Sequence, residues 1–317
     1  MTISPELQQL VHGQDAENVP DSIHALSEAL LKRHTDAIQA ILFYGSCLRS
    51  DSDIEGIVDL YLIVDTYSLI YDTTFLAIAN KLLPPNVFYI EVPFQDRTVR
   101  AKYAILSLPD FQRSTSMKWF HSYFWARFAQ PTKVLYTATP QVEQKIYSTL
   151  AQAIMTFLTR TLPQTPQSFD ALTLWETGLS LTYRAELRTE KPGRIKQIVE
   201  ANRDYYQQTA DAALPQLSPP AIIDRSVQPP CFQAPCSSAV RQLNSVTWLL
   251  RRGQGKVLSI LRLIKGLFTF QGGVDYILWK IERHSGVSIE LTPQQRKHPL
   301  LASPVVFWKL YRKGAFR

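Results

Sequence analysis

Two apolar runs separated by a glycine turn constrain this chain more than any other feature of its sequence. The first run, Ile41-Leu42-Phe43-Tyr44, ends at Gly45-Ser46, and the second extends from Ile57 to Val64. Short apolar runs that stop at Gly and Ser are typical of strands that enter a turn. We therefore predict two strands here, with Gly45 and Ser46 at the end of the first.

Helical spacing and further strand-like runs surround this pair. We expect helices over Ser22 to Ile38, Phe75 to Leu83, Gln141 to Leu158 and Leu172 to Tyr183, and strands over Val87 to Val92 and Arg100 to Leu108. The segment from Ser116 to Val199 is predicted to be mostly helical. These elements predict an α+β fold in which a mixed sheet with helices is followed by a mainly helical part.

Asp59 and the Gly45-Ser46 turn together form a candidate catalytic site. It lies in the second predicted strand, thirteen residues after Ser46. A glycine turn lets backbone N–H groups approach a triphosphate, and the Ser46 hydroxyl adds a donor. A carboxylate on a neighbouring strand can hold Mg²⁺, which neutralises the triphosphate. Gly45, Ser46 and Asp59 therefore indicate a magnesium-dependent nucleotidyltransferase.

Two-metal nucleotidyltransferases usually carry a second carboxylate two positions later, because residues i and i+2 share a strand face. That position holds Tyr61. Glu91, on a later predicted strand, is a candidate for a further metal ligand, although a solvated edge residue fits its position equally well.

Several motifs together resemble one known family. They are Tyr44-Gly45-Ser46, Asp59-Leu60-Tyr61, Lys102-Tyr103, the stretch from Thr182 to Arg188 and, loosely, Phe128-Ala129-Gln130-Pro131 against a Gly-Arg-x-x-Lys-Pro pattern. On these residues the chain resembles the mitochondrial-type phosphatidate cytidylyltransferases, which make CDP-diacylglycerol. It departs from the family pattern at Ala185, Glu186 and Cys47.

The resemblance implies a nucleotidyltransferase fold followed by a winged-helix-like domain. It also implies that CMP passes from CTP to phosphatidic acid, or to a related lipid phosphate, and that pyrophosphate is released. In this reading Asp59 ligates Mg²⁺, and Tyr44, Gly45 and Ser46 hold the triphosphate. Lys102, Arg184 and Arg188 neutralise phosphates. Read from spacing alone, Arg184 and Arg188 share a helix face and can grip phosphate oxygens or form a solvated face.

The expected domains are a nucleotidyltransferase domain (1–112), a helical, winged-helix-like domain (113–214), a Pro-rich linker (215–238) and a basic helical extension (239–317). From Arg241 onward the chain has 14 Lys and Arg against three acids. Such a patch suits either nucleic acid or an anionic membrane. With a lipid substrate we expect the membrane and no nucleic acid. The segment Lys256 to Phe270 could lie in a membrane interface or pack on the body.

No run reaches the roughly 18 apolar residues of a membrane span, and no secretory signal is evident. With only three cysteines, we expect a cytoplasmic enzyme associated peripherally with the inner face of a membrane. Two alternatives remain. One is a nucleotidyltransferase acting on RNA, protein or a soluble phosphorylated acceptor. The other is a catalytically decayed RNA-binding protein, which Tyr61 keeps open.

Overall fold

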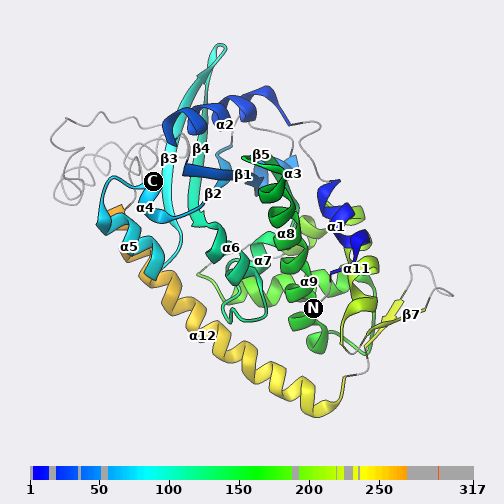
Figure 1. The fold of residues 1–317 in the computed structure, drawn as a ribbon. Coiled ribbons are helices and arrows are strands. Elements are labelled where there is room, and N and C mark those ends of the chain that lie inside the picture. The colour runs from blue at the N-terminus through cyan, green and yellow to red at the C-terminus, as the bar shows by residue number, and fades with distance from the viewer. Residues whose placement is uncertain are drawn as a thin grey trace, which may run out of the picture.

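A computed structural model describes residues 3–13, 19–34, 37–50, 56–187, 193–218, 220–224, 231–234, 236–269 and 292. The chain has an α+β fold (Figure 1). A five-stranded mixed sheet is covered by helices, a group of further helices carries a small second sheet, and a long helix, α12 (Ser238–Thr269), runs along one side.

The five-stranded sheet has the order β3-β4-β2-β1-β5. Its strands are β1 (Ile38–Tyr44), β2 (Val58–Val64), β3 (Asn86–Phe94), β4 (Arg97–Ser107) and β5 (Thr132–Thr137). Strands β2 and β4 are parallel and the other neighbouring pairs are antiparallel. The predicted mixed sheet is confirmed.

Strand β5 differs from the sequence prediction, which made this segment mostly helical. It pairs with β1, so that Thr132 lies opposite Tyr44. The strand is short and lies at the edge of the sheet. The sequence of this segment has no strong strand pattern, and it forms a strand because it pairs with β1 in the folded protein. Tertiary context commonly overrides local propensity in strands.

Alternation along the strands divides the sheet into two buried faces. Leu42, Tyr61 and Leu106 face one apolar cluster, which is packed by α6 (Leu108–Thr115), α7 (Trp125–Phe128) and α8 (Pro140–Thr161). Ile41, Leu60 and Ile105 face the other, under α2 (Asp21–His34) and α4 (Tyr67–Ile70). The short helix α3 (Ser46–Ser50) follows β1 directly, and α5 (Thr74–Leu82) precedes β3.

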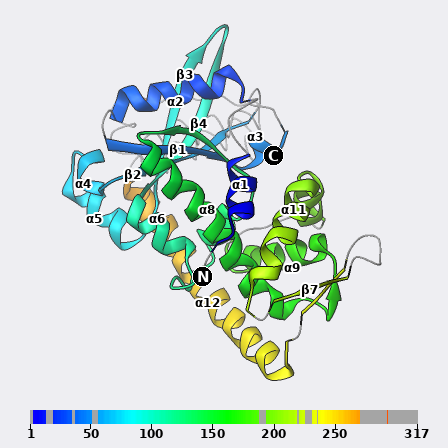
Figure 2. The same ribbon diagram turned by 45° about the vertical axis from the view of Figure 1, so that its right-hand side comes forward.

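The helical group is built on α8 and α9 (Ala171–Arg184), with α10 (Arg194–Glu200) and α11 (Arg203–Ala213). Side-chain caps start the two longer helices, because Thr139 accepts from the N–H of Val142 and Asp170 from that of Thr173. Stacked rings of Phe157 and Trp175, with centroids 4.6 Å apart, join the two helices. Figure 2 shows this group on the side of the molecule away from β3.

Two connections cross the boundaries expected from the sequence. Helix α1 (Pro5–His12) packs on α8 and α11, and the Ser4 N–H donates to Gln216 Oε1 over 2.8 Å. Within the Pro-rich stretch, β7 (Ile222–Asp224) and β8 (Cys231–Gln233) form a three-stranded sheet with β6 (Ser168–Phe169). Short intervals between prolines therefore still supply backbone N–H groups for pairing.

Helix α12 agrees with the helical periodicity predicted from about residue 239. In both ribbon views it runs from the region of β7 and α9 towards α5 and α6 (Figures 1 and 2). Across the ranges that the structure describes, no helix is both long and apolar enough to cross a membrane.

Candidate active site

The end of β1 places a glycine against a carboxylate. Asp59 on β2 lies opposite Tyr44 in register, and Gly45 follows with a φ of +96°, in the left-handed region that favours glycine. A Cβ built on Gly45 would lie 2.8 Å from Asp59 Oδ2. Glycine is therefore required at position 45 for two reasons, its left-handed backbone conformation and the close approach of Asp59.

Lys102 on β4 completes an ion pair with this carboxylate. Parallel pairing puts Lys102 level with Asp59, and its Nζ lies 3.2 Å from Asp59 Oδ1. Both side chains are partly exposed, so the pair faces an open space rather than the packed core. The strand register thus brings together two residues that are far apart in the sequence.

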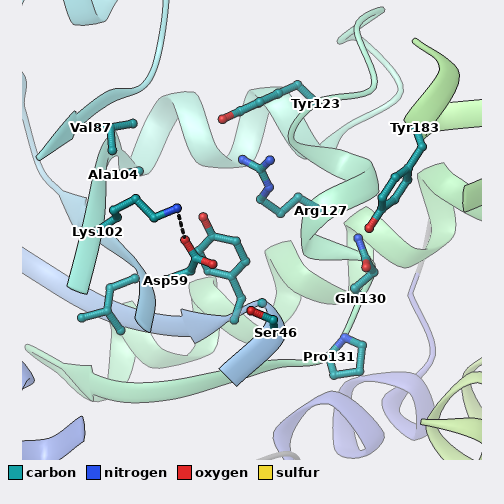
Figure 3. A pocket seen from close by; sticks show the side chains of 13 residues that line it. Ser46, Asp59, Val87, Lys102, Ala104, Tyr123, Arg127, Gln130, Pro131 and Tyr183 are labelled. Carbon is teal, nitrogen blue, oxygen red and sulfur yellow. Dashed lines mark ion pairs between the residues drawn. The ribbon is translucent and has the colours of Figure 1, made fainter. Parts of the chain in front are cut away.

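These residues line a cavity of about 330 Å³ (Figure 3). Its lining consists of Tyr44, Gly45, Ser46, Asp59, Leu60, Val87, Lys102, Ala104, Tyr123, Arg127, Gln130, Pro131 and Tyr183. Sheet residues form one wall, and residues of α7, α9 and the adjoining turns form the other. In the close-up, Arg127 and Tyr183 approach from the side opposite Lys102.

Tyr61 occupies the position where a second metal-binding carboxylate would be expected, but it contacts Arg127 instead. Its side chain is fully buried, and its ring lies 5.1 Å from that of Tyr44. Arg127 Nη1 donates to the Tyr61 hydroxyl over 3.0 Å. Tyr61 therefore fixes a cation at the cavity wall.

Arg127 gives the cavity its second cation beside Lys102. Its Cζ lies 4.1 Å from the ring centroid of Tyr123 and 5.6 Å from that of Tyr44. Burial opposes charge on this side chain, but the tyrosine hydroxyls around it outweigh burial and raise the pKa of the guanidinium above its ordinary value. A charged guanidinium among aromatic rings is well suited to bind phosphate oxygens.

The structure brings most of the predicted site residues together. Tyr44, Gly45, Ser46, Asp59 and Lys102 all line the cavity. The remaining three candidates lie elsewhere or outside the described residues.

Glu91 is not part of the cavity lining. Its carboxylate accepts from the Tyr89 hydroxyl over 2.7 Å and pairs with Arg100 over 3.1 Å, in an exposed part of β3. Arg184 is exposed at the end of α9 and does not line the cavity, whereas its neighbour Tyr183 does. Arg188 lies outside the described residues.

Three further residues of the cavity lining, Arg127, Tyr123 and Gln130, were not predicted from the sequence. A signal existed in the loosely similar Gly-Arg-x-x-Lys-Pro stretch. When Pro131 is set at its proline, Arg127 falls on its arginine and Gln130 on its lysine. Tyr123 had no such signal, because it lies in an aromatic-rich stretch that is typical of a packed core.

The cavity suits a metal that arrives with a triphosphate. Mg²⁺ is commonly held by one or two carboxylates, with substrate phosphates and waters as its other ligands. Asp59 offers one carboxylate beside the Gly45 turn. Within the described parts of the chain, no group of three or more His, Cys, Asp or Glu side chains could hold a metal alone. The residues present fit a metal–nucleotide complex.

Comparison with known proteins agrees with this chemistry. A family model described as "Phosphatidate cytidylyltransferase, mitochondrial" matches residues 65–244, more than half of the chain. No curated protein matches the chain. The matched range includes Lys102, Tyr123 and Arg127 but begins after Asp59. The fold is what joins these three residues to the Gly45 turn and Asp59.

Proposed function

Because the chain belongs to the mitochondrial phosphatidate cytidylyltransferase family, an enzyme family of the nucleotidyltransferase type, we propose that it transfers CMP from CTP to phosphatidic acid. The products are CDP-diacylglycerol and pyrophosphate. The observation that carries this proposal is the Asp59 carboxylate, held between the Gly45 turn and Lys102 in a cavity that also contains Arg127.

In the proposed reaction a phosphate oxygen of phosphatidic acid attacks the α-phosphorus of CTP. A new P–O–P linkage forms, the bond between the α-phosphorus and the bridging oxygen breaks, and pyrophosphate leaves with that electron pair. The lipid phosphate is already anionic at neutral pH, so the step needs no dedicated general base. Positioning and charge neutralisation supply the acceleration.

Each residue has a role that follows from its place. Asp59 would hold Mg²⁺, which when bound neutralises the triphosphate and the leaving pyrophosphate. The Gly45–Ser46 turn would bind phosphate oxygens through N–H and hydroxyl donors, with Tyr44 beside it. Lys102 and Arg127 would face the phosphates from two sides of the cavity. We do not assign Glu91 to the metal, because its carboxylate pairs with Arg100 away from the cavity.

We further propose that the enzyme meets its lipid substrate at an anionic membrane surface. A cavity of about 330 Å³ is at the small end of ligand pockets and has no room for a nucleotide and two acyl chains. The lipid tails must therefore stay outside while the phosphate enters.

Exposed apolar side chains support this membrane contact. On α5 they are Phe75, Ile78 and Leu82, and on the second half of α12 they are Val257, Ile260, Leu261, Leu263, Ile264 and Phe268. Lys265 donates to the carbonyls of Leu83 and Pro85, which directly follow α5. The second half of α12 therefore lies beside the end of α5, and Figure 1 shows the two helices next to each other.

Transfer of label from CTP tests the reaction. With CTP labelled at the α-phosphate, Mg²⁺ and vesicles containing phosphatidic acid, we expect label in a lipid product. Vesicles that contain diacylglycerol in place of phosphatidic acid lack the acceptor phosphate; they provide the matched control and should yield none. Label in RNA or protein instead of lipid would contradict the proposal, and so would an absence of transfer to every acceptor.

A further inference from the structure

Helix α12 is attached to the rest of the chain by its cations. Four of its basic side chains donate to backbone carbonyl oxygens outside the helix, namely Arg241 to Pro163 and Thr165, Arg251 to Phe120, Arg262 to Pro84, and Lys265 to Leu83 and Pro85. These charges point inward, while the exposed side chains of the helix include many that are apolar. The basic character of this helix is thus used largely within the protein.

Arg262 reaches the wall of the nucleotide cavity. Its Nε donates to Pro84 O over 2.9 Å, and its Cζ lies 4.1 Å from the ring centroid of Tyr123. Tyr123 lines the cavity and makes the same 4.1 Å contact with Arg127. The Tyr123 ring therefore contacts two guanidinium groups, that of Arg127 in the cavity and that of Arg262 on α12.

The packing of α12 here is close. A Cβ added to Gly255 would collide with the carbonyl oxygen of Ala185, at the end of α9. Tyr183, two residues earlier, is itself part of the cavity wall. Burial alone would raise the pKa of the Tyr123 hydroxyl, but the positive charges of Arg127 and Arg262 outweigh it and lower that pKa. Both geometry and charge thus connect Arg262 to the site.

We propose that Arg262 is a positioning residue for the nucleotide site, acting through Tyr123 on Arg127, so that α12 completes the site. This inference rests on the proposed function, because it assumes that Arg127 binds nucleotide phosphates. A guanidinium over an aromatic ring is attracted by the ring's electrons. Arg262 therefore holds the Tyr123 ring in the place where it supports Arg127.

With this contact α12 has a second role beside membrane contact. Val257, Ile260 and Leu261, which are exposed, lie within two turns of Arg262 on the same helix. A displacement of α12 at a lipid surface would therefore be transmitted to Tyr123 and the cavity. Nucleotide binding and membrane docking would then be coupled through α12.

The test compares Arg262→Met with Lys256→Met in the full chain. Both variants remove one positive charge from α12 and keep a long apolar stem, but Lys256 is exposed. We expect Arg262→Met to weaken Mg²⁺–CTP binding by about 10- to 100-fold, the range typical for loss of a group that orients a ligand-binding residue. Lys256→Met should bind as wild type does. Arg262→Lys, which keeps a cation, should recover part of the loss.

A double-mutant cycle with Tyr123→Ala separates positioning from general destabilisation. If Arg262 acts through Tyr123, Arg262→Met should cost little further affinity in the Tyr123→Ala background. An equal cost in both backgrounds, or equal binding by Arg262→Met and Lys256→Met, would overturn the proposal.

Because nucleotide binding is measured without lipid, the outcome is separate from that of the proposed function. Wild type that binds CTP but transfers nothing to phosphatidic acid would refute the proposed function while the Arg262 comparison still stands. Wild type that binds no nucleotide would refute both.

Discussion

The carboxylate of Asp59 lies against the backbone of Gly45, so closely that a Cβ on residue 45 would stand 2.8 Å from Asp59 Oδ2. This contact links the turn proposed to bind phosphate to the residue proposed to bind the metal. The Gly45-Ser46 turn at the end of β1 and Asp59 on β2 therefore form one site rather than two separate features.

Gly45→Ala should therefore disable the site. The substitution introduces a side chain at a φ of +96° and drives it against Asp59. We expect at least a 100-fold loss of pyrophosphate release, because the carboxylate and the turn are both displaced. Gly253→Ala is the matched control, since a Cβ there meets nothing within 4 Å. Comparable activity in the two variants would show that the Gly45 contact is dispensable.

Asp59→Asn removes the proposed metal ligand with almost no change in volume. Loss of one electrostatic stabiliser typically costs about 10²–10³ in rate, and a metal ligand should cost at least as much. Steady-state kinetics should show this loss while the melting temperature stays close to that of wild type. Glu91→Gln, outside the cavity, should remain active. An Asp59→Asn enzyme with more than about a tenth of wild-type activity would remove Asp59 from the metal site.

The apolar surface of α5 and α12 predicts how the protein binds vesicles. Ile78→Asp places a charge where the proposed membrane contact lies, and we expect less protein to sediment with vesicles containing phosphatidic acid. Ile222→Asp is the control, because Ile222 is also exposed but lies on β7, at the other end of the molecule. If both variants sediment as wild type does, the membrane contact lies elsewhere.

The lowered pKa of Lys265 predicts that the free energy of unfolding depends on pH. Burial, followed by the charge of Arg262, lowers the pKa of Lys265 from 10.5 to about 7. Between these values the unfolded chain holds a proton on this lysine that the folded chain lacks, so its contribution to stability rises with pH. Below about pH 7 both states are protonated and the slope vanishes.

Urea unfolding of wild type and Lys265→Met from pH 6 to 9 measures this effect. The stability of wild type relative to the variant should increase above pH 7, by at most about 1.4 kcal/mol per pH unit. A difference that stays constant, or that decreases as the pH rises, would show that Lys265 keeps its proton in the folded protein.

The central strands and the Gly45–Asp59 arrangement were predictable because their signals are local. Apolar runs that stop at glycine indicate strand ends, and Asp59 stands out in an otherwise apolar strand. Lys102 was found through the resemblance to the family, and the parallel pairing of β2 and β4 explains why it meets Asp59. Strand β5 was missed because the free edge of β1 determines its pairing.

The far wall of the cavity was harder to predict, because distant contacts create it. Arg127 follows a run of aromatic residues that resembles a packed core, and only the fold turns its guanidinium towards Tyr61 and the cavity. Arg262 looked like one charge of a basic tail. Composition does not reveal the direction in which a helix points its cations, so the contact with Tyr123 had no sequence signature.

Pyrophosphate release with each of the four nucleoside triphosphates tests the central claim most directly. The full chain would be supplied with Mg²⁺ and assayed with and without vesicles containing phosphatidic acid. We predict release with CTP that depends on the lipid and far less release with ATP, GTP or UTP. Equal release from all four nucleotides, or CTP turnover that does not depend on phosphatidic acid, would contradict the proposal that this site catalyses the CTP:phosphatidate cytidylyltransferase reaction.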